Sequence, residues 1–181
     1  FFLEREEGVL ENIIAEITDM NERRKDELAS LYSRLHEECR TGDRHRAGDG
    51  MYFVRDAGVP DGLCGLLANR LAEAFGRPVI VVALAQGRDV VKGSGRASGK
   101  FDFFSRVVPY SSLFERIGGH PQAFGFSIRV DKLEDARRAI ASGLECAPYG
   151  KKEHGFPIFA DVRPDGIAGF TTEFVDSLKI F

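Results

Sequence analysis

Apolar side chains recur at helical spacing in the first part of the chain. Leu10, Ile13, Ile14 and Ile17 share one face, and a second apolar stripe runs through residues 28–35, so the pattern predicts helix over residues 8–39. The polar stretch 21–27 lies between the two stripes, and Thr18 or Asp19 is placed to cap a second helix, so one long helix and two consecutive helices both fit. Such a helix suits either a connector between domains or an amphipathic helix packed on its own domain.

The middle of the chain has the pattern of a strand, a helix and a second strand. Residues 51–55 form a short apolar strand, and the turn that follows places Asp61 to cap a helix over residues 62–75. Gly76 and Pro78 are typical signals for the end of that helix. The β-branched run 78–85 predicts a strand covered on both faces.

The rest of the chain alternates in the same way. The expected elements are a strand, two helices, a strand and a helix capped by Asp131, at residues 89–98, 103–108, 111–117, 124–130 and 131–141, with a last helix beginning at Thr171 or Thr172. Residues 40–50 are predicted to be a solvated loop in which His45 has no role. This order favours an α/β domain with a mixed β-sheet flanked by helices, preceded by a long N-terminal helix.

Composition narrows the class of protein. With 43% hydrophobic and 29% charged residues the chain is of ordinary globular type, and no apolar run approaches the roughly 20 residues of a membrane helix, so we expect no membrane partner. The net charge of −3 means that any surface for nucleic acid must be local. Cys39, Cys64 and Cys146 are odd in number and widely spaced, which argues against disulfides and zinc and favours the cytoplasm.

The two ends of the sequence bear on domain organisation. The chain starts with Phe1 rather than Met and stops at the apolar residues 178–181, so we expect a piece of a longer protein. Residues 1–46 would be a connector from a catalytic domain, 47–142 the domain proper, and 143–181 an extension.

A first glycine-rich segment covers residues 92–100, KGSGRASGK. It fails the P-loop pattern, which needs glycine and Ser or Thr where Ser94 and Phe101 stand, and it fails the dinucleotide fingerprint at Ser98. Small residues let a backbone approach a ligand, and Arg96 offers planar donors that match phosphate oxygens. Residues 88–106 hold five basic and two acidic residues, so the segment is either a phosphate-binding surface or a strand end with solvated charges.

A second segment, IGGHP at residues 117–121, follows a predicted helix and precedes a strand. Gly118 and Gly119 can turn their N–H groups toward an anion, and His120 can donate to a phosphate oxygen. The same residues also suit a helix C-cap with a surface histidine. The sequence holds no Asp-His-His triplet, paired metal-binding histidines or nucleophile elbow, so chemistry must come from elsewhere.

Taken together, the two segments and their spacing resemble the DHH-associated substrate-binding domain of RecJ-type single-strand-specific exonucleases. The resemblance extends over four stretches: GVPDGLCGLLANRL at 58–71, GRPVIVV at 76–82, KGSGRA at 92–97 and LFERIGGH at 113–120. Ala123 and Gly125 occupy the family's small positions, and Val59 and Pro60 stand where the family usually has an aromatic residue and a histidine.

The resemblance implies a division of labour between two domains. The catalytic DHH domain, absent from this chain, would hold Mn or Mg and hydrolyse phosphodiester bonds, so the chain alone would be inactive and carry no cofactor. This domain would bind the phosphates of single-stranded DNA or of an oligonucleotide through Ser94, Gly95, Arg96, Gly118, Gly119 and His120. Two alternatives remain: a family phosphodiesterase acting on short RNA or cyclic dinucleotides, and a non-catalytic nucleic-acid-binding module.

Overall fold

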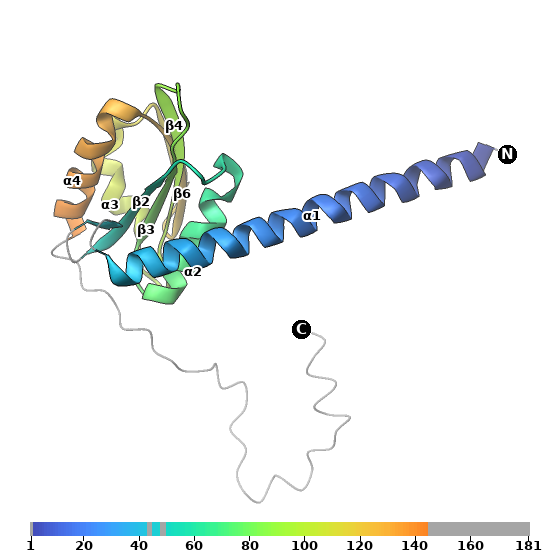
Figure 1. Cartoon of the computed structure of the whole chain (residues 1–181). Coiled ribbons are helices and arrows are strands. Elements are labelled where there is room, and N and C mark those ends of the chain that lie inside the picture. The colour runs from blue at the N-terminus through green and yellow to red at the C-terminus, as the bar shows by residue number, and fades with distance from the viewer. Residues whose placement is uncertain (1, 43–44, 48–49, 145–181) are drawn as a thin grey trace, which may run out of the picture.

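The computed structural model describes residues 2–42, 45–47 and 50–144 (Figure 1). Most of the expected extension 143–181 lies outside the described residues, as do Cys146 and the helix expected at Thr171 or Thr172. The described part is a mixed sheet with helices on both sides and a long N-terminal helix, which confirms the predicted fold class.

The sheet has six strands in the order β1-β2-β3-β4-β6-β5. Their bounds are β1 Arg46–Ala47, β2 Met51–Asp56, β3 Val79–Ala83, β4 Val90–Arg96, β5 Arg116–His120 and β6 Ala123–Arg129. Only the β2–β3 pair is parallel among these strands, because α2 (Cys64–Phe75) connects them by a crossover. In the antiparallel pair β4–β6, the connection contains α3, a 3₁₀ helix and β5. Gly76 ends α2 in the left-handed conformation (φ 62°), which confirms the predicted helix stop.

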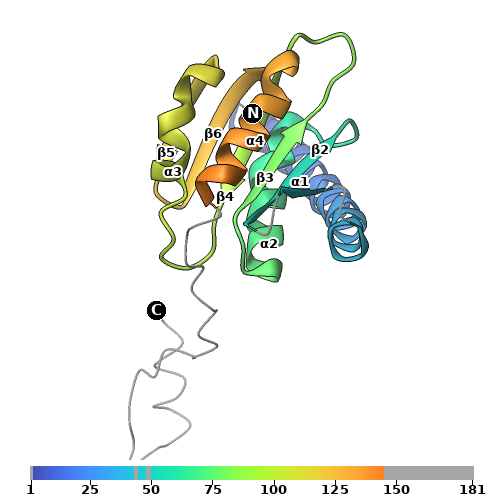
Figure 2. The same ribbon diagram turned by 90° about the vertical axis from the view of Figure 1, so that its left-hand side faces the viewer.

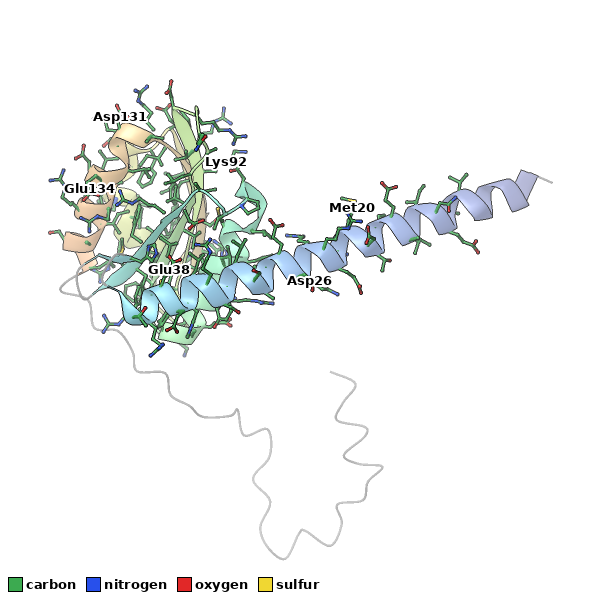
Figure 3. All side chains as sticks on the ribbon, in the orientation of Figure 1. Met20, Asp26, Glu38, Lys92, Asp131 and Glu134 are labelled. Atoms are coloured by element: carbon green, nitrogen blue, oxygen red, sulfur yellow. The ribbon has the colours of Figure 1, made fainter. Side chains whose placement is uncertain are left out.

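The N-terminal helix α1 is a single helix, Phe2–Thr41. Thr18 does not cap a second helix, because its hydroxyl donates to the carbonyl of Ile14 one turn back. Leu28, Leu35 and Cys39 pack against the domain, whereas the earlier part of α1 projects away from it and leaves Ile13 and Met20 exposed (Figures 1 and 3). Among the described residues no helix is both long and apolar enough to cross a membrane.

A hydrogen-bonded network fixes α1 to the sheet. The guanidinium of Arg34 donates to both carboxylate oxygens of Asp56 at the end of β2, at 2.8 and 3.0 Å, and to Glu38 at 3.1 Å. Glu38 in turn lies 2.9 Å from Nε2 of His45. His45 is 2% exposed, so the prediction that it lies in a solvated loop is wrong: its ring is buried and contacts Glu38 of the network.

Two apolar cores lie on opposite sides of the sheet, and Figure 2 shows the helices that cover them. On one side α3 (Phe104–Val107) and α4 (Leu133–Leu144) cover all the long strands, with Phe53, Ile80, Phe124 and Phe126 beneath them. On the other side α1 and α2 cover Tyr52, Val54, Val79, Val81 and Ala83, which all belong to β2 and β3. Because all five residues of β3 are buried, the prediction of a strand covered on both faces is confirmed.

Three further predicted local features are wrong. The expected helix 111–117 is a short 3₁₀ helix, Val108–Leu113, followed by strand β5, because residues from Arg116 onward pair with β6 and Ile117 packs on the α3–α4 core. Asp61 does not cap α2: it lies inside a 3₁₀ turn, Asp61–Leu63, that precedes this helix, and its side chain makes ion pairs instead. Asp131 likewise lies inside a 3₁₀ turn, Val130–Lys132, and its carboxylate pairs with Arg129 in place of capping α4.

Candidate nucleic-acid interface

On the α1–α2 side, helix α2 reaches as far as β4, and strands β5 and β6 have no helix over them among the described residues. The core beneath α1 and α2 contains residues of β2 and β3 but none of β4, β5 or β6 among the described residues. Strand side chains alternate between faces, and β4 and β6 show this alternation clearly, since Val91, Gly93, Gly95 and Phe124 are buried on the α3–α4 side. The intervening residues of these strands therefore form an open face.

The strand register arranges the open face as three rows. Residues directly opposite each other in antiparallel strands point to the same side of the sheet. The rows, each read across β4, β6 and β5, are Arg96–Ala123–His120, Ser94–Gly125–Gly118 and Lys92–Ser127–Arg116. Given the usual strand dimensions, this array measures roughly 13 by 10 Å.

Small residues form the floor of the open face and nitrogen-bearing side chains form its corners. A Cβ atom added at Gly118 would meet nothing within 4 Å, and one at Gly125 would reach only the carbonyl of Gly93, at 4.0 Å. The four corners are Arg96, His120, Lys92 and Arg116. The open face is thus a flat, glycine-floored surface with donors at its edge.

Arg96 is the most constrained of these corner residues. Its Nη1 donates to the carbonyls of Gly95 (2.8 Å) and Phe124 (3.1 Å), which aim the guanidinium across the sheet. No carboxylate pairs with it in the described part of the chain. Burial lowers the pKa of Arg96 below its ordinary value, but a guanidinium stays charged at neutral pH. A half-buried, uncompensated cation is a favourable site for an anion.

Gly65 allows Arg96 to lie against the first turn of α2. A Cβ atom at residue 65 would be 2.8 Å from Nη2 of Arg96 and 3.6 Å from the hydroxyl oxygen of Ser94. The guanidinium and the Ser94 hydroxyl therefore both lie near Gly65, between the helix and the open face. Ser94 and Arg96 are half-buried there, which leaves both side chains partly accessible to solvent.

The predicted site residues fall into two groups by direction. Ser94, Arg96, Gly118 and His120 belong to the open face, and the two glycine-rich segments that contain them are joined through β6. Gly95 and Gly119 are both opposite Phe124, so they belong to the other face of the sheet, which α3 and α4 cover. The Phe124 ring fills the space over Gly95, where a Cβ would overlap it, and a Cβ at Gly119 would overlap the carbonyl of Ala123. Packing against neighbouring residues therefore accounts for these two glycines.

Neither sequence interpretation of residues 117–121 describes the structure. Gly118 and Gly119 lie within strand β5, at the edge of the described sheet, rather than at a helix C-terminus or in an anion nest. His120 is exposed, and no described residue gives its ring a hydrogen bond or an ion pair. The imidazole is free to meet a ligand that lies on the open face.

Lys92, Arg116, Gly125 and Ser127 belong to the open face but were not predicted as site residues. The signal in the sequence is the alternation along 91–96 and 123–129, where every second residue is small or polar although the others are apolar or glycine. Conversely, Arg106 from the predicted basic stretch lies on α3, which covers the opposite side of the sheet.

A hollow of about 330 Å³ adjoins the Lys92 corner. It is lined by the turn 57–61, residues 83–85 and Arg88. Asp61 lies on its wall, with one carboxylate oxygen 3.3 Å from Arg88 and 3.6 Å from Lys92. The turn that departs from the family pattern at Val59 and Pro60 thus borders the open face.

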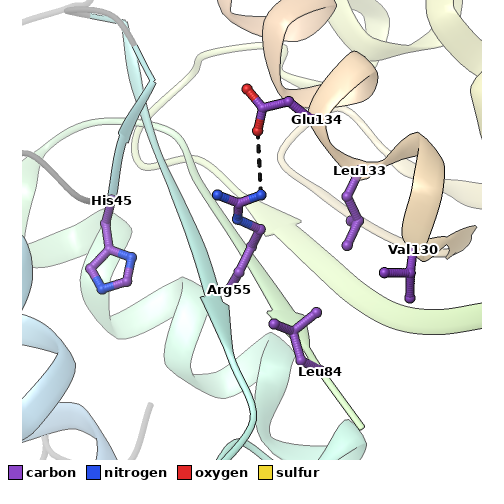
Figure 4. Close-up of a pocket in the computed structure, with 6 residues that line it drawn as sticks. All are labelled: His45, Arg55, Leu84, Val130, Leu133 and Glu134. Carbon is purple, nitrogen blue, oxygen red and sulfur yellow. Dashed lines mark hydrogen bonds and ion pairs between the residues drawn. The ribbon is translucent and has the colours of Figure 1, made fainter. Parts of the chain in front are cut away.

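A second hollow of about 330 Å³ lies away from the open face, near α4 (Figure 4). Arg55 and Glu134 line it and make an ion pair of 3.3 Å, while Leu84, Val130 and Leu133 supply apolar walls. Because its cation is already compensated, this hollow is a weaker candidate for an anion than the open face. No group of three or more His, Cys, Asp or Glu side chains could hold a metal ion within the described ranges.

Comparison with known proteins identifies the family and the fold. The family model "DHHA1 domain" matches residues 49–145. The chain is 26% identical over 131 residues to the single-stranded-DNA-specific exonuclease RecJ of Bacillus subtilis (strain 168), covering 72% of this chain and 16% of that protein. It is 39% identical over 77 residues to the Escherichia coli (strain K12) exonuclease of the same name, covering 40% and 13%.

Among solved structures, the RecJ of Thermus thermophilus in complex with Mg²⁺ has the same fold. The TM-score is 0.60 at 24% identity, over 75% of this chain and 20% of that one. The two proteins thus share a mixed sheet with a long N-terminal helix. The chain belongs to the DHHA1 domain family, as the sequence resemblance predicted, and spans less than a fifth of the length of these curated relatives.

Proposed function

We propose that the open face binds the phosphates of single-stranded nucleic acid for a RecJ-like exonuclease whose catalytic domain lies outside this chain. The observation that supports this most strongly is Arg96: its guanidinium is half-buried, aimed by two carbonyls and without a carboxylate partner in the described residues. A phosphate oxygen at this position would accept a charge-assisted hydrogen bond from Nη2, and the Ser94 hydroxyl also lies near Gly65.

The chemistry of the open face favours contacts to the nucleic-acid backbone over contacts to bases. Phe124 and Phe126 point into the opposite core, so the face holds no Phe, Tyr or Trp ring on which bases could stack in the described strands β4, β5 and β6. Its donors are guanidinium, ammonium, imidazole and hydroxyl groups, which suit phosphate oxygens. Binding of this kind depends little on sequence and strongly on salt.

Hydrolysis is assigned in this proposal to a separate DHH domain that would hold Mn or Mg. The described residues offer no metal-ligand group, and the relatives that match are far longer than this chain. The role of the open face would be to neutralise phosphate charge and hold the strand against that domain, because bound donors of fixed geometry stabilise phosphoryl-transfer substrates.

Binding of a fluorescent thymidine oligonucleotide to the 181-residue chain over a range of salt concentrations tests the proposal. We expect Arg96→Gln to weaken binding about tenfold or more, since a hydrogen bond to a charged group is lost, and to reduce the salt slope by roughly 0.7. Arg138→Gln is the matched control, because Arg138 is paired with Asp135 on α4, which covers the other side of the sheet. Equal affinities for both variants would overturn the proposal.

A further inference from the structure

One carboxylate interrupts the basic edge of the open face. The same oxygen of Asp61, Oδ2, lies 3.3 Å from Nη1 of Arg88 and 3.6 Å from Nζ of Lys92. The other basic corners, Arg96 and Arg116, have no carboxylate partner among the described residues. Among the four corners of the open face, the Lys92 corner is therefore the one at which the positive charge is partly cancelled by a carboxylate of the described residues.

The Asp61 oxygen stands where a phosphate oxygen would bind. Lys92 lies on the open face in the same column as Ser94 and Arg96, four residues and about 13 Å from Arg96 along β4. Figure 3 shows Lys92 on the side of the sheet opposite Glu134. Arg88 and Lys92 are 58% and 67% exposed, so a strand that continues along β4 from Arg96 would reach both cations and would compete with the carboxylate.

Local structure does not require a negative charge at residue 61. The 3₁₀ turn Asp61–Leu63 begins after Pro60 without a side-chain capping bond, and the side chain of Asp61 leaves the helix to meet the two cations. An acidic residue in a first turn has a modest favourable interaction with the helix dipole. Asparagine would keep the shape and the hydrogen-bonding oxygen while removing the charge.

We propose that Asp61 determines how far along a strand the open face makes phosphate contacts. By occupying Arg88 and Lys92 it restricts tight contact to the Arg96 end and weakens the hold on the rest of a long strand. This inference rests on the proposed function. Arg96 would increase the affinity for single-stranded nucleic acid, whereas Asp61 would limit it. The part of the ligand that Asp61 affects is the stretch of single-stranded nucleic acid that continues beyond Arg96 toward Lys92, and its phosphates are the groups that would be recognised.

The test compares a long and a short probe with the 181-residue chain. We expect Asp61→Asn to lower the Kd for a thymidine dodecamer about five- to tenfold at low salt. The variant removes a carboxylate that repels the phosphates and competes with them for Arg88 and Lys92. The salt slope should steepen by roughly 0.7. A 5′-phosphorylated thymidine dinucleotide, too short to reach from Arg96 to Lys92, should bind unchanged. The variant Asp61→Asn/Lys92→Gln should lose the gain, since the two residues act as a pair.

Asp135→Asn is the matched control. Asp135 also lies in the first turn of a helix and also pairs with an arginine, Arg138, at 2.9 Å, but its helix α4 covers the opposite side of the sheet. It should change the Kd for the dodecamer by less than about twofold. Thermal unfolding of each variant reports whether the fold is intact, and Asp61→Ser gives the same expectation should the asparagine variant fold poorly.

The outcomes separate this inference from the proposed function. If Asp61→Asn leaves the dodecamer affinity unchanged, or if Asp135→Asn raises it equally, the role of Asp61 is wrong, and a loss of binding in Arg96→Gln still supports the phosphate-binding face. If neither the wild-type chain nor Asp61→Asn binds the dodecamer, both the inference and the proposed function are wrong.

Discussion

Arg96 and His120 lie on the same face of the sheet, each directly opposite Ala123 of the strand between them. Two strand spacings separate their backbones, about 10 Å, and the side chains between them are small. The two glycine-rich segments therefore meet through β6, with a guanidinium and an imidazole at the two ends of one row. This relationship makes a shared phosphate surface geometrically possible.

Gly65→Ala should separate binding from stability. Alanine favours a helix over glycine by about 1 kcal/mol, so the melting temperature should stay the same or rise. The added Cβ would be 2.8 Å from Nη2 of Arg96, which must shift away from residue 65, so oligonucleotide affinity should fall. Calorimetry and fluorescence anisotropy on one sample measure both quantities.

The control for that variant is Gly62→Ala, three residues earlier. A Cβ atom at Gly62 meets nothing within 4 Å, so this variant should leave both the melting temperature and the affinity close to wild type. If Gly65→Ala folds and binds as tightly as Gly62→Ala, the position of the Arg96 guanidinium does not matter for binding.

Neighbouring glycines in β5 should respond differently to alanine. Gly118→Ala adds a methyl group in open space on the face that we assign to the ligand, so the protein should fold normally and bind more weakly. Gly119→Ala brings a Cβ into overlap with the Ala123 carbonyl and should lower the free energy of unfolding by about 1–3 kcal/mol, because backbone atoms must move. Chemical denaturation measures the stability difference, and a Gly118→Ala variant with lost stability and unchanged affinity would contradict this assignment.

The ion pair between Arg34 and Asp56 should make the attachment of α1 sensitive to acid. The Arg34 guanidinium holds the pKa of the Asp56 carboxyl below its ordinary value. A carboxylate with a depressed folded-state pKa stabilises the fold above its unfolded pKa of about 3.9, and this contribution is lost as the pH falls through the lower folded-state value. Asp56→Asn should therefore lower stability at neutral pH by about 1 kcal/mol and by progressively less below about pH 4.

Urea denaturation of wild type and Asp56→Asn at several pH values checks this expectation. Asparagine can still accept the 2.7 Å hydrogen bond from the Gly58 N–H, but its amide NH₂ cannot accept the second hydrogen bond from Arg34. The pH dependence of the stability difference, and not its size, therefore reports the contribution of the charge. Asp131→Asn serves as the control, since Asp131 pairs with Arg129 on the surface and takes no part in holding α1. A stability difference for Asp56→Asn that is independent of pH would show that the Arg34 pair contributes nothing through its charge.

The sequence predicted the fold well where one local signal dominates. The β-branched run of β3 and the Gly76 stop of α2 are decided by residues close in the chain, so periodicity and capping rules were sufficient. Leu113 and Ile117 have helical spacing, yet Arg116 onward forms β5, because pairing with β6 decides the conformation there. Pairing between distant strands is not visible in a local pattern.

The candidate site shows the same limit. Arg96 and His120 were recognisable from their glycine-rich surroundings, but the reason for the individual glycines was not. Gly95 accommodates the Phe124 ring and Gly118 faces open space, a distinction that depends on which side of a strand each residue occupies. The carboxylate of Asp61 was expected to cap a helix, because its partners Arg88 and Lys92 are brought near it only by the fold.

Mapping the amide chemical shifts of the 181-residue chain during titration with a single-stranded thymidine oligonucleotide tests the central claim most directly. The account predicts that shifts concentrate on the open face, at Ser94, Arg96, Gly118, His120 and Gly125, while the amides of α4 stay in place. Shifts that cluster on α3 and α4 with none on the open face, or no shifts at all at low salt, would contradict it.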